Sequence, residues 1–289
     1  MENSNDQNHE FSAITAHNEG AGAKIICVSS GKGGVGKTVS AVHLAMFARK
    51  LGYRVLIIDG AFGMSSVDVV LGLDARYNVR NVFDGTASLR DIILSGPNGI
   101  KVVSSGSGLA SLQQLTFVQK QILFEDLKSL REDFDLFIFD TSAGIGKNVV
   151  FLNQLAQKNL IVTSTEPHAI ADAYALIKTL RDSLQTRELD LIVNMTKSDK
   201  EGEKVASRIV CVAKEFLQMK VNYIGCVPVD PILSRFILHG KLGSDESSKT
   251  FSAQAWGNIT RRILDHMNTQ TELATQSVFS SIFDSSYSL

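Results

Sequence analysis

The chain lacks the features that mark several classes of protein. Its three cysteines are widely spaced and include no CxxC pair, which argues against a disulfide framework or a zinc site and fits a reducing cytosol. The six histidines are scattered, without metal-ligand spacing. No run of 18 apolar residues could span a membrane, and the polar, acidic N-terminus does not resemble a signal peptide. We therefore expect a cytoplasmic protein.

An excess of positive charge is also missing. The 29 lysines and arginines are balanced by 30 aspartates and glutamates, so the formal net charge is −1. This balance argues against a surface built for nucleic acid, and we do not expect nucleic acid as a partner, although a local basic patch would be compatible with it. What the chain has is 289 residues of which 44% are hydrophobic, which indicates a globular protein of one large or two small domains.

The composition divides the chain into three parts. Residues 1–22 are polar with scattered apolar positions, which predicts a flexible N-terminal arm. Residues 23–268 contain the apolar runs, and we expect them to form one domain. Residues 269–289 are rich in Ser and Thr and contain no Lys or Arg, so we expect a separate C-terminal tail.

Short, continuously apolar runs alternate with helical patterns through the central part. Such runs are typical of strands that are covered on both faces. The expected strands are 24–30, 54–60, 101–105, 135–141, 159–165, 190–196 and 223–229, and the expected helices are 38–52, 116–130, 169–182, 201–219 and 251–267. This alternation predicts an α/β fold, a doubly wound and mostly parallel sheet with helices on both faces.

A glycine-rich stretch between the first strand and the first helix carries the clearest chemistry. Residues 31–38, GKGGVGKT, fit the phosphate-binding pattern G-x-x-x-x-G-K-[ST] in the strand–loop–helix context that the pattern requires. Glycines let backbone N–H groups approach a phosphate closely, and the following helix adds partial positive charge. Lys37 would contact the β/γ-phosphates and the Thr38 hydroxyl would ligate Mg²⁺. The expected nucleotide-binding residues here are Gly31, Lys32, Gly33, Gly34, Val35, Gly36, Lys37, Thr38 and Val39.

The second lysine of this loop gives the pattern a more specific meaning. K-G-G-V-G-K-T resembles the deviant phosphate-binding motif of the MinD/ParA family of P-loop ATPases. The resemblance implies ATP and Mg²⁺ as ligands and an ATP-dependent homodimer, in which Lys32 reaches the nucleotide of the partner subunit and takes part in catalysis. It also implies that Asp59, after "VLIID", acts in catalysis and holds the magnesium shell. Asp140, in "DLFIFDTSAGI", would lie near the metal through water.

Other stretches resemble one branch of that family, the flagellar-number regulators of the FlhG/FleN (YlxH) type. They are "VDVVLGL" (67–73), "VTSTEPHAIADAYALIKTL" (162–180) and "LIVNMTKSDKEGEKV" (191–205). The likeness covers about residues 24–240. It implies that Asn194 reads the adenine edge, that Glu166 lies near the dimer interface and that Pro228 contacts the base. A flagellar GTPase of the FlhF type, or another flagellar regulator, is the implied partner.

The chain departs from the family in a loop that helps hydrolysis. The family has D-x-D after its second strand, and its second aspartate helps to position the attacking water, whereas this chain has Asp59-Gly60-Ala61. Ser66 stands where the branch usually has asparagine. Because this catalysis depends mostly on positioning and electrostatics, we expect ATP binding with weakened hydrolysis. The alternative is that another residue takes over the role.

Both ends of the chain also differ from the branch. The D-Q-A-x-x-L-R motif toward the partner GTPase is matched only by Asp6-Gln7. In the tail, an apolar cluster at helical spacing suggests an amphipathic helix, yet no Lys or Arg is present to attract anionic lipid. The tail could pack on the domain, stay disordered or bind a partner, or dock on the inner face of the cell membrane.

These observations lead to three hypotheses. The first is an ATP-switched, dimerising ATPase that regulates flagellar number or placement. The second is a regulatory protein that binds nucleotide with little or no turnover, which Ala61 and Ser66 favour. The third is a relative that positions a division site or a cargo.

Overall fold

The computed structural model describes residues 23–106, 112–184 and 187–284, with side chains up to residue 268. The expected N-terminal arm therefore lies outside the described residues, as do the side chains of the expected tail. Within the described part, no helix is long and apolar enough to cross a membrane.

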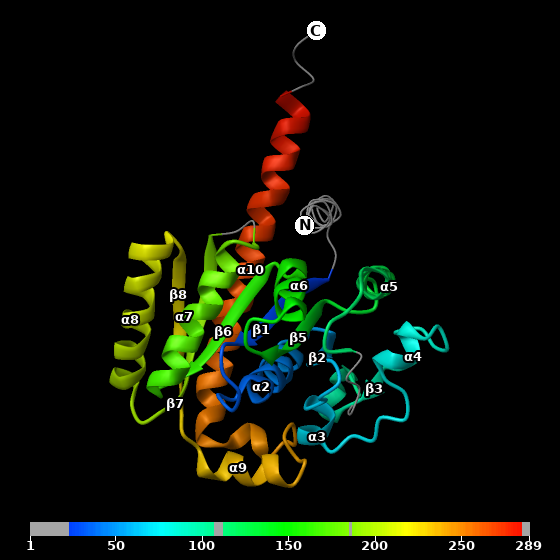
Figure 1. The fold of residues 1–289 in the computed structure, drawn as a ribbon, viewed down its shortest axis with the longest axis horizontal. Coiled ribbons are helices and arrows are strands. Elements are labelled where there is room, and N and C mark those ends of the chain that lie inside the picture. The colour runs from blue at the N-terminus through cyan, green and yellow to red at the C-terminus, as the bar shows by residue number, and fades with distance from the viewer. Residues whose placement is uncertain (1–22, 107–111, 185–186, 285–289) are drawn as a thin grey trace.

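One sheet organises the described part of the chain, as the alternating pattern predicts (Figure 1). Its eight strands follow the order β3-β4-β2-β5-β1-β6-β7-β8. All neighbouring pairs are parallel except β3 with β4, so the predicted fold class is confirmed and one short antiparallel edge strand is added. The strands are β1 (Lys24–Ser30), β2 (Val55–Gly60), β3 (Leu94–Ser95), β4 (Lys101–Val103), β5 (Leu136–Ala143), β6 (Lys158–Ser164), β7 (Glu188–Thr196) and β8 (Lys220–Pro228).

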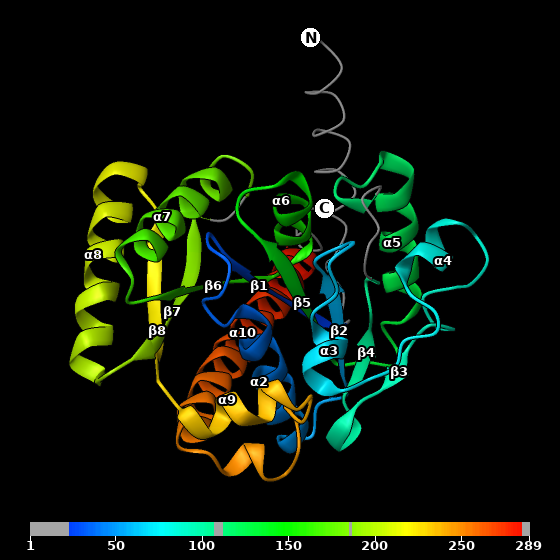
Figure 2. The same cartoon turned by 60° about the horizontal axis from the view of Figure 1, so that its bottom comes forward.

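Helices cover both faces of this sheet. They are α2 (Lys37–Lys50), α3 (Val67–Leu71), α4 (Val79–Phe83), α5 (Phe117–Ser129), α6 (Lys147–Leu155), α7 (Pro167–Arg181), α8 (Asp199–Leu217), α9 (Pro231–Leu238) and α10 (Phe251–Asp284). The buried clusters place α2 and α10 against one face, and α4, α5, α6, α7 and α8 against the other. Figure 2 shows α2 and α10 side by side below the sheet.

The strands read as apolar runs because each face of the sheet has its own core. Successive strand residues point to opposite faces, so in β1 Ile26 joins the α2/α10 core while Ile25 and Cys27 join the α5/α6 core. All three are at most 4% exposed. The chain therefore needs apolar side chains at consecutive strand positions, which is the pattern the sequence has.

Four of the described helices, α3, α4, α6 and α9, were not predicted from the sequence, and one extends past its predicted end. α6 has nine residues and α9 has eight, and each follows directly on a glycine or proline segment that reads as a loop. α9 begins where the Asp230 carboxylate accepts the backbone N–H groups of Ile232 and Leu233. The helix expected over 251–267 continues without a break to Asp284, across the division we expected between domain and tail.

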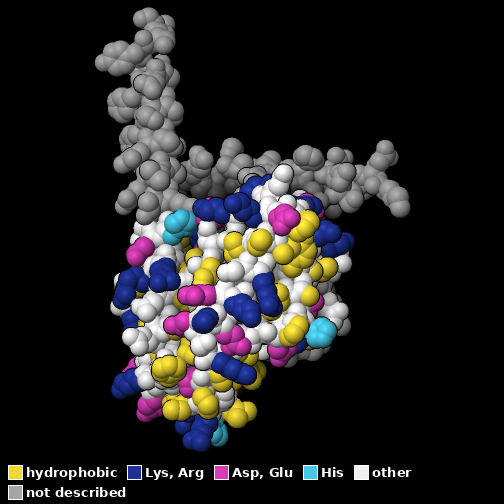
Figure 3. Space-filling model, turned by 90° about the vertical axis from the view of Figure 1, so that its left-hand side faces the viewer, with side chains coloured by type: hydrophobic (Ala, Val, Ile, Leu, Met, Phe, Trp, Pro, Cys, Tyr) yellow, Lys and Arg dark blue, Asp and Glu magenta, His cyan; other side chains and the backbone are white. Residues whose placement is uncertain are grey.

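Charges of both signs are interspersed on the face that carries α8 (Figure 3). This distribution agrees with the balanced composition and leaves no single-sign field over that face.

Candidate nucleotide site

The glycine-rich loop connects the carboxyl end of β1 to the start of α2, at the edge of the sheet where the parallel strands end. Two of its glycines are required by close contacts. Gly36 has φ 88°, and a Cβ there would meet the amide of Asn194 at 2.2 Å. A Cβ on Gly31 would lie 2.1 Å from the carbonyl oxygen of Asp172. At Gly33 and Gly34 a Cβ would meet nothing within 4 Å in the part of the chain that the structure describes, so there the middle of the loop is open for a ligand.

The lysine and threonine that end the loop meet one buried carboxylate. Lys37 Nζ lies 2.7 Å from Asp140 Oδ1, and the Thr38 hydroxyl donates to Asp140 Oδ2 at 2.6 Å. Asp140 lies in β5 and is fully buried, and the Lys37 side chain is 10% exposed. The three residues that the sequence analysis assigned to phosphate and metal therefore lie together, although 102 positions separate Thr38 from Asp140.

A second carboxylate lies beside the first because of the strand register. β2 pairs with β5 so that Asp59 is directly opposite Asp140. Burial and the neighbouring Asp140 carboxylate raise the pKa of Asp59 to about 6. The Asp59 carboxylate also accepts backbone N–H groups of Ala61, Ser66 and Val67, which hold the following loop around it.

These oxygen atoms fit a magnesium ion. Mg²⁺ takes oxygen ligands, and it usually uses one or two carboxylates together with waters and substrate phosphates. Thr38, Asp59 and Asp140 supply such a set, and a cation between the two carboxylates would relieve the repulsion that raises the pKa of Asp59. Among the described residues no cluster of three or more His, Cys, Asp and Glu side chains forms, so a bound nucleotide would have to complete the coordination.

The loop after β2 contains a serine network that the sequence analysis missed. The Ser65 hydroxyl donates to Asp68 at 2.8 Å and lies 3.0 Å from the Ser104 hydroxyl, which donates to Asp68 at 2.6 Å. Ser66 lies 3.1 Å from the Thr38 hydroxyl, so this loop contacts the phosphate loop directly. Serines are frequent and 39 positions separate Ser65 from Ser104, so no local pattern could have identified the network.

Ala61 lies inside this loop. Its side chain is buried, its backbone N–H donates to Asp59 at 2.9 Å, and its carbonyl oxygen accepts from the Ser105 hydroxyl. At the position where the resemblance implies a second aspartate, the structure therefore has a buried methyl group, which offers no hydrogen-bond acceptor.

The signature lysine forms an ion pair within its own chain. Lys32 Nζ contacts Glu166 Oε2, and the two side chains are 36% and 64% exposed. The hydrogen bond from Lys32 lowers the pKa of Glu166. Both side chains therefore lie at the phosphate loop and are accessible from outside the chain.

The two residues expected to contact the adenine base lie on β7 and β8, the last two strands of the sheet along the chain. The Asn194 amide donates to the carbonyl oxygen of Val35 at 2.9 Å, so in this structure it braces the phosphate loop. Pro228 ends β8 opposite Thr196 of β7. Val39, in the first turn of α2, packs half-buried against the α2/α10 core.

Comparison with known proteins places these features in a family. Residues 23–193 match the family described as AAA domain. The chain is 39% identical over 208 residues to the antiactivator FleN of Pseudomonas aeruginosa, covering 72% of this chain and 74% of FleN. It is 32% identical over 220 residues to the flagellum site-determining protein YlxH of Helicobacter pylori, covering 76% and 74%.

The solved structures agree in fold. The septum site-determining protein MinD of Pyrococcus horikoshii, complexed with Mg-ADP, superposes with a TM-score of 0.68 and 22% identity, covering 83% of this chain and 96% of that one. At this identity the likeness concerns the fold alone. The phosphate loop with its two lysines, the two adjacent carboxylates and the level of identity to FleN and YlxH together show that the chain belongs to the MinD/ParA family of P-loop ATPases, in its FlhG/FleN branch.

Proposed function

We propose that this protein is an ATP-dependent, dimerising switch that regulates flagellar number or placement. The observation that carries the proposal is the cluster of Lys37, Thr38, Asp59 and Asp140 beside an accessible Lys32. FleN is named an antiactivator and YlxH a flagellum site-determining protein, which supports a regulatory role connected with flagella.

Each part of the cluster has a role toward Mg-ATP. The open middle of the loop would take the phosphates on its backbone N–H groups. Lys37, now held by Asp140, would contact the β/γ-phosphates, while Thr38 and the two carboxylates would hold the metal. Bound Mg²⁺ neutralises charge on the phosphates. Lys32 would leave Glu166 and reach the nucleotide of a second subunit.

The first test is nucleotide binding. We expect Lys37→Ala to weaken ATP affinity at least about tenfold in calorimetry, because a charge-assisted phosphate contact is lost. Lys50→Ala, at the far end of the same helix, is the control and should bind like the wild type. Equal affinity of the Lys37 variant and the wild type would reject the site.

We infer in addition that partners bind the ATP form. A flagellar GTPase of the FlhF type, or another flagellar regulator, is the proposed protein partner. The proposed location is the cytoplasm, with the dimer acting at the inner face of the cell membrane. Pull-down of such a GTPase with protein in ATP, in ADP and without nucleotide tests the partner, and vesicle sedimentation under the same conditions tests the membrane.

A second candidate function is supported by Ala61. A protein with no acceptor at this position would bind ATP and dimerise yet hydrolyse slowly, so that bound nucleotide acts structurally. Phosphate release measured beside nucleotide affinity separates the two functions. A turnover near 1 s⁻¹ or above, in the common range of about 1–10³ s⁻¹, would leave only the hydrolysing switch.

A further inference from the structure

The face between α5 and α6 contains a small pocket that has no part in the nucleotide site. Its floor comes from Ile25 of β1 and Phe137 of β5, each the second residue of its strand. Since the phosphate loop follows the carboxyl end of β1, this pocket lies at the opposite edge of the sheet. Phe124 and Leu127 of α5 and Leu155 of α6 complete its apolar lining.

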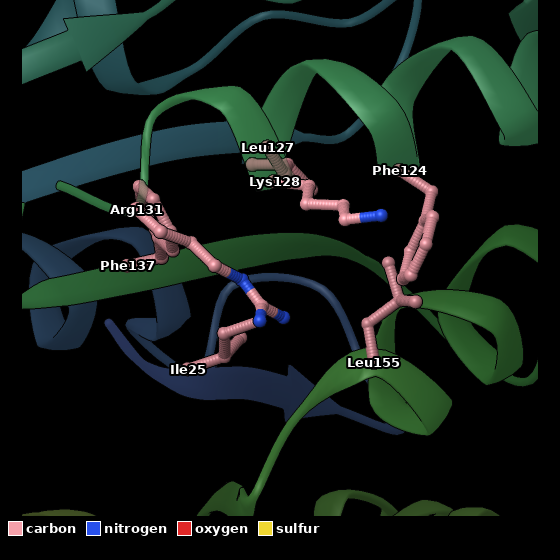
Figure 4. A pocket seen from close by; sticks show the side chains of 7 residues that line it. All are labelled: Ile25, Phe124, Leu127, Lys128, Arg131, Phe137 and Leu155. Carbon is pink, nitrogen blue, oxygen red and sulfur yellow. The ribbon is translucent and has the colours of Figure 1, made fainter. Parts of the chain in front are cut away.

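Positive charge surrounds this apolar lining. Figure 4 shows the side chains of Lys128 and Arg131 extending across the hollow. At the other end of α5, the Lys120 ammonium lies 5.0 Å from the centre of the Phe151 ring of α6. Burial and the neighbouring Lys147 lower the pKa of Lys120, which indicates that like charges are brought together there. A ligand for this face should therefore combine apolar side chains with negative charge.

The positively charged and aromatic side chains of α5 lie on one side of the helix. Lys120, Phe124 and Lys128 recur at intervals of four residues, which places them along one stripe of the helix, and Arg131 follows shortly after the helix ends at Ser129. Glu125 forms a wide ion pair of 4.0 Å with Lys128, and both side chains are more than half exposed. Such an exposed pair holds Lys128 weakly and leaves it able to contact another carboxylate.

The N-terminal 22 residues of the chain have the matching chemistry. They contain Glu2, Asp6, Glu10 and Glu19 and no Lys or Arg, and they carry two larger apolar side chains three positions apart, Phe11 and Ile14. This segment enters the domain at Ala23, two residues before Ile25 in the pocket floor. In Figure 1 the start of β1 lies between α5 and α6.

The length of the segment allows it to reach the pocket. Ala23 is twelve positions after Phe11, and at about 3.3 Å per position the chain between them spans up to roughly 40 Å. A segment tethered this close acts at an effective concentration in the millimolar range, above that of a free partner of similar composition.

We propose that the face between α5 and α6 is the docking site of the chain's own N-terminal segment. Phe11 and Ile14 pack against the apolar lining, and the acidic residues pair with the cations of α5. The contact is intramolecular and does not depend on the proposed function.

A photoreactive side chain tests this assignment in the full chain. p-Benzoylphenylalanine at position 11 should crosslink to peptides of α5 or α6 of the same chain, with a yield that does not change with protein concentration. The same group at Phe216, 65% exposed on α8, is the control and should give no crosslink to residues 1–22. Crosslinks only between chains would assign the face to a second copy and overturn the proposal. Crosslinks to parts of the chain other than α5 and α6, or no crosslink at all, would also overturn the proposal. In that case another partner would have to bind this face.

A charge reversal gives a second measurement. Lys128→Glu should lower the crosslink yield by about two- to fivefold, as expected for loss of an exposed ion pair. Lys214→Glu on α8 should leave the yield unchanged. If the two variants behave alike, charge does not hold the segment and the proposed pairing is wrong.

Discussion

At the scale of single residues, the nucleotide site is a set of charges that hold one another. Asp140 holds Lys37 and Thr38, and Glu166 holds Lys32. Each of these contacts occupies a group that the proposed function assigns to phosphate, to metal or to a second subunit. Under the proposed function, nucleotide binding and dimerisation must therefore break these contacts and replace them with contacts to phosphate, metal or the second subunit.

The exchange at Lys32 can be measured. We expect Glu166→Gln to shift the ATP-dependent monomer–dimer equilibrium toward dimer by about twofold or more, because the variant no longer holds the lysine by charge. Light scattering across a titration of ATP measures the shift. Glu203→Gln, an exposed substitution on α8, is the control. An unchanged or weaker dimer would mean that the ion pair does not compete with dimerisation.

We expect the lack of a carboxylate at Ala61 to affect the rate of ATP hydrolysis. We expect Ala61→Asp, alone or with Ser66→Asn, to raise kcat by about tenfold or more with little change in ATP affinity, because each 1.36 kcal/mol of barrier is a factor of ten. This pattern marks a group that acts only in the transition state. Ala87→Asp, outside the site, controls for added charge. A double variant that dimerises but is no faster than the wild type would contradict the idea.

At the scale of elements, the helix that follows the phosphate loop packs directly on the last helix. The imidazole of His43 on α2 stacks on the Trp256 ring of α10, with ring centres 5.4 Å apart. His43 Nδ1 contacts the carbonyl oxygen of Val39, and Nε2 is buried without a hydrogen-bond partner among the described residues. Burial lowers the pKa of His43 to about 4. This interface joins the nucleotide site to the element that continues to Asp284.

The buried imidazole gives a pH dependence with a defined sign. Between about pH 6.5 and 4 only the unfolded chain binds the proton, so His43 makes the fold less stable as pH falls through this range. The contribution is of the order of 3 kcal/mol. The pKa of Asp59 is raised to about 6, so this group has the opposite effect on the free energy of unfolding. The stability that it contributes at low pH is lost as pH rises toward 6. The two effects are separated by comparing variants.

We expect His43→Phe to remove most of the acid-dependent loss of stability that His43 causes. Urea unfolding at pH 5 and pH 7, followed by the fluorescence of Trp256, the one tryptophan of the sequence, measures the difference. Because Asp59 is present in both proteins, its contribution cancels. His168→Phe, at an exposed position, is the matched control. Parallel pH profiles for wild type and the His43 variant would show that this imidazole is not the responsible group.

At the scale of the whole molecule, the site is half of an assembly under the proposed function. Lys32 is exposed at the sheet edge that holds the phosphate loop, where its ammonium group contacts Glu166. A second subunit would bring its own Lys32 to this edge. The functional unit would then be two chains that share two nucleotides.

Removal of the signature lysine should separate binding from assembly. We expect Lys32→Ala to bind ATP with an affinity close to that of the wild type, because Lys37 retains the charge-assisted phosphate contact. We also expect it to stay monomeric with ATP in size-exclusion chromatography with light scattering. Lys204→Ala, exposed on α8, should dimerise normally. Normal ATP-dependent dimerisation of the Lys32 variant would disprove the cross-subunit role.

The sequence by itself determined what depends on local pattern. Consecutive apolar strand positions predicted a sheet with both faces covered, and the glycine spacing at residues 31–38 predicted the strand–loop–helix turn. The two lysines of that turn were enough to indicate the family. Short elements without long periodicity, such as α6 and α9, could not be predicted, because eight or nine residues between turns contain too few helical repeats.

The tertiary structure decided every contact between distant parts of the chain. The register of β2 against β5 puts Asp59 beside Asp140, and the meeting of β1 with the start of α7 lets Lys32 contact Glu166 across 134 positions. The serine network around Asp68 and the stack of His43 on Trp256 arise in the same way. Local propensity specifies where strands and helices form, but such pairs depend on strand register and helix packing, which only the folded chain fixes.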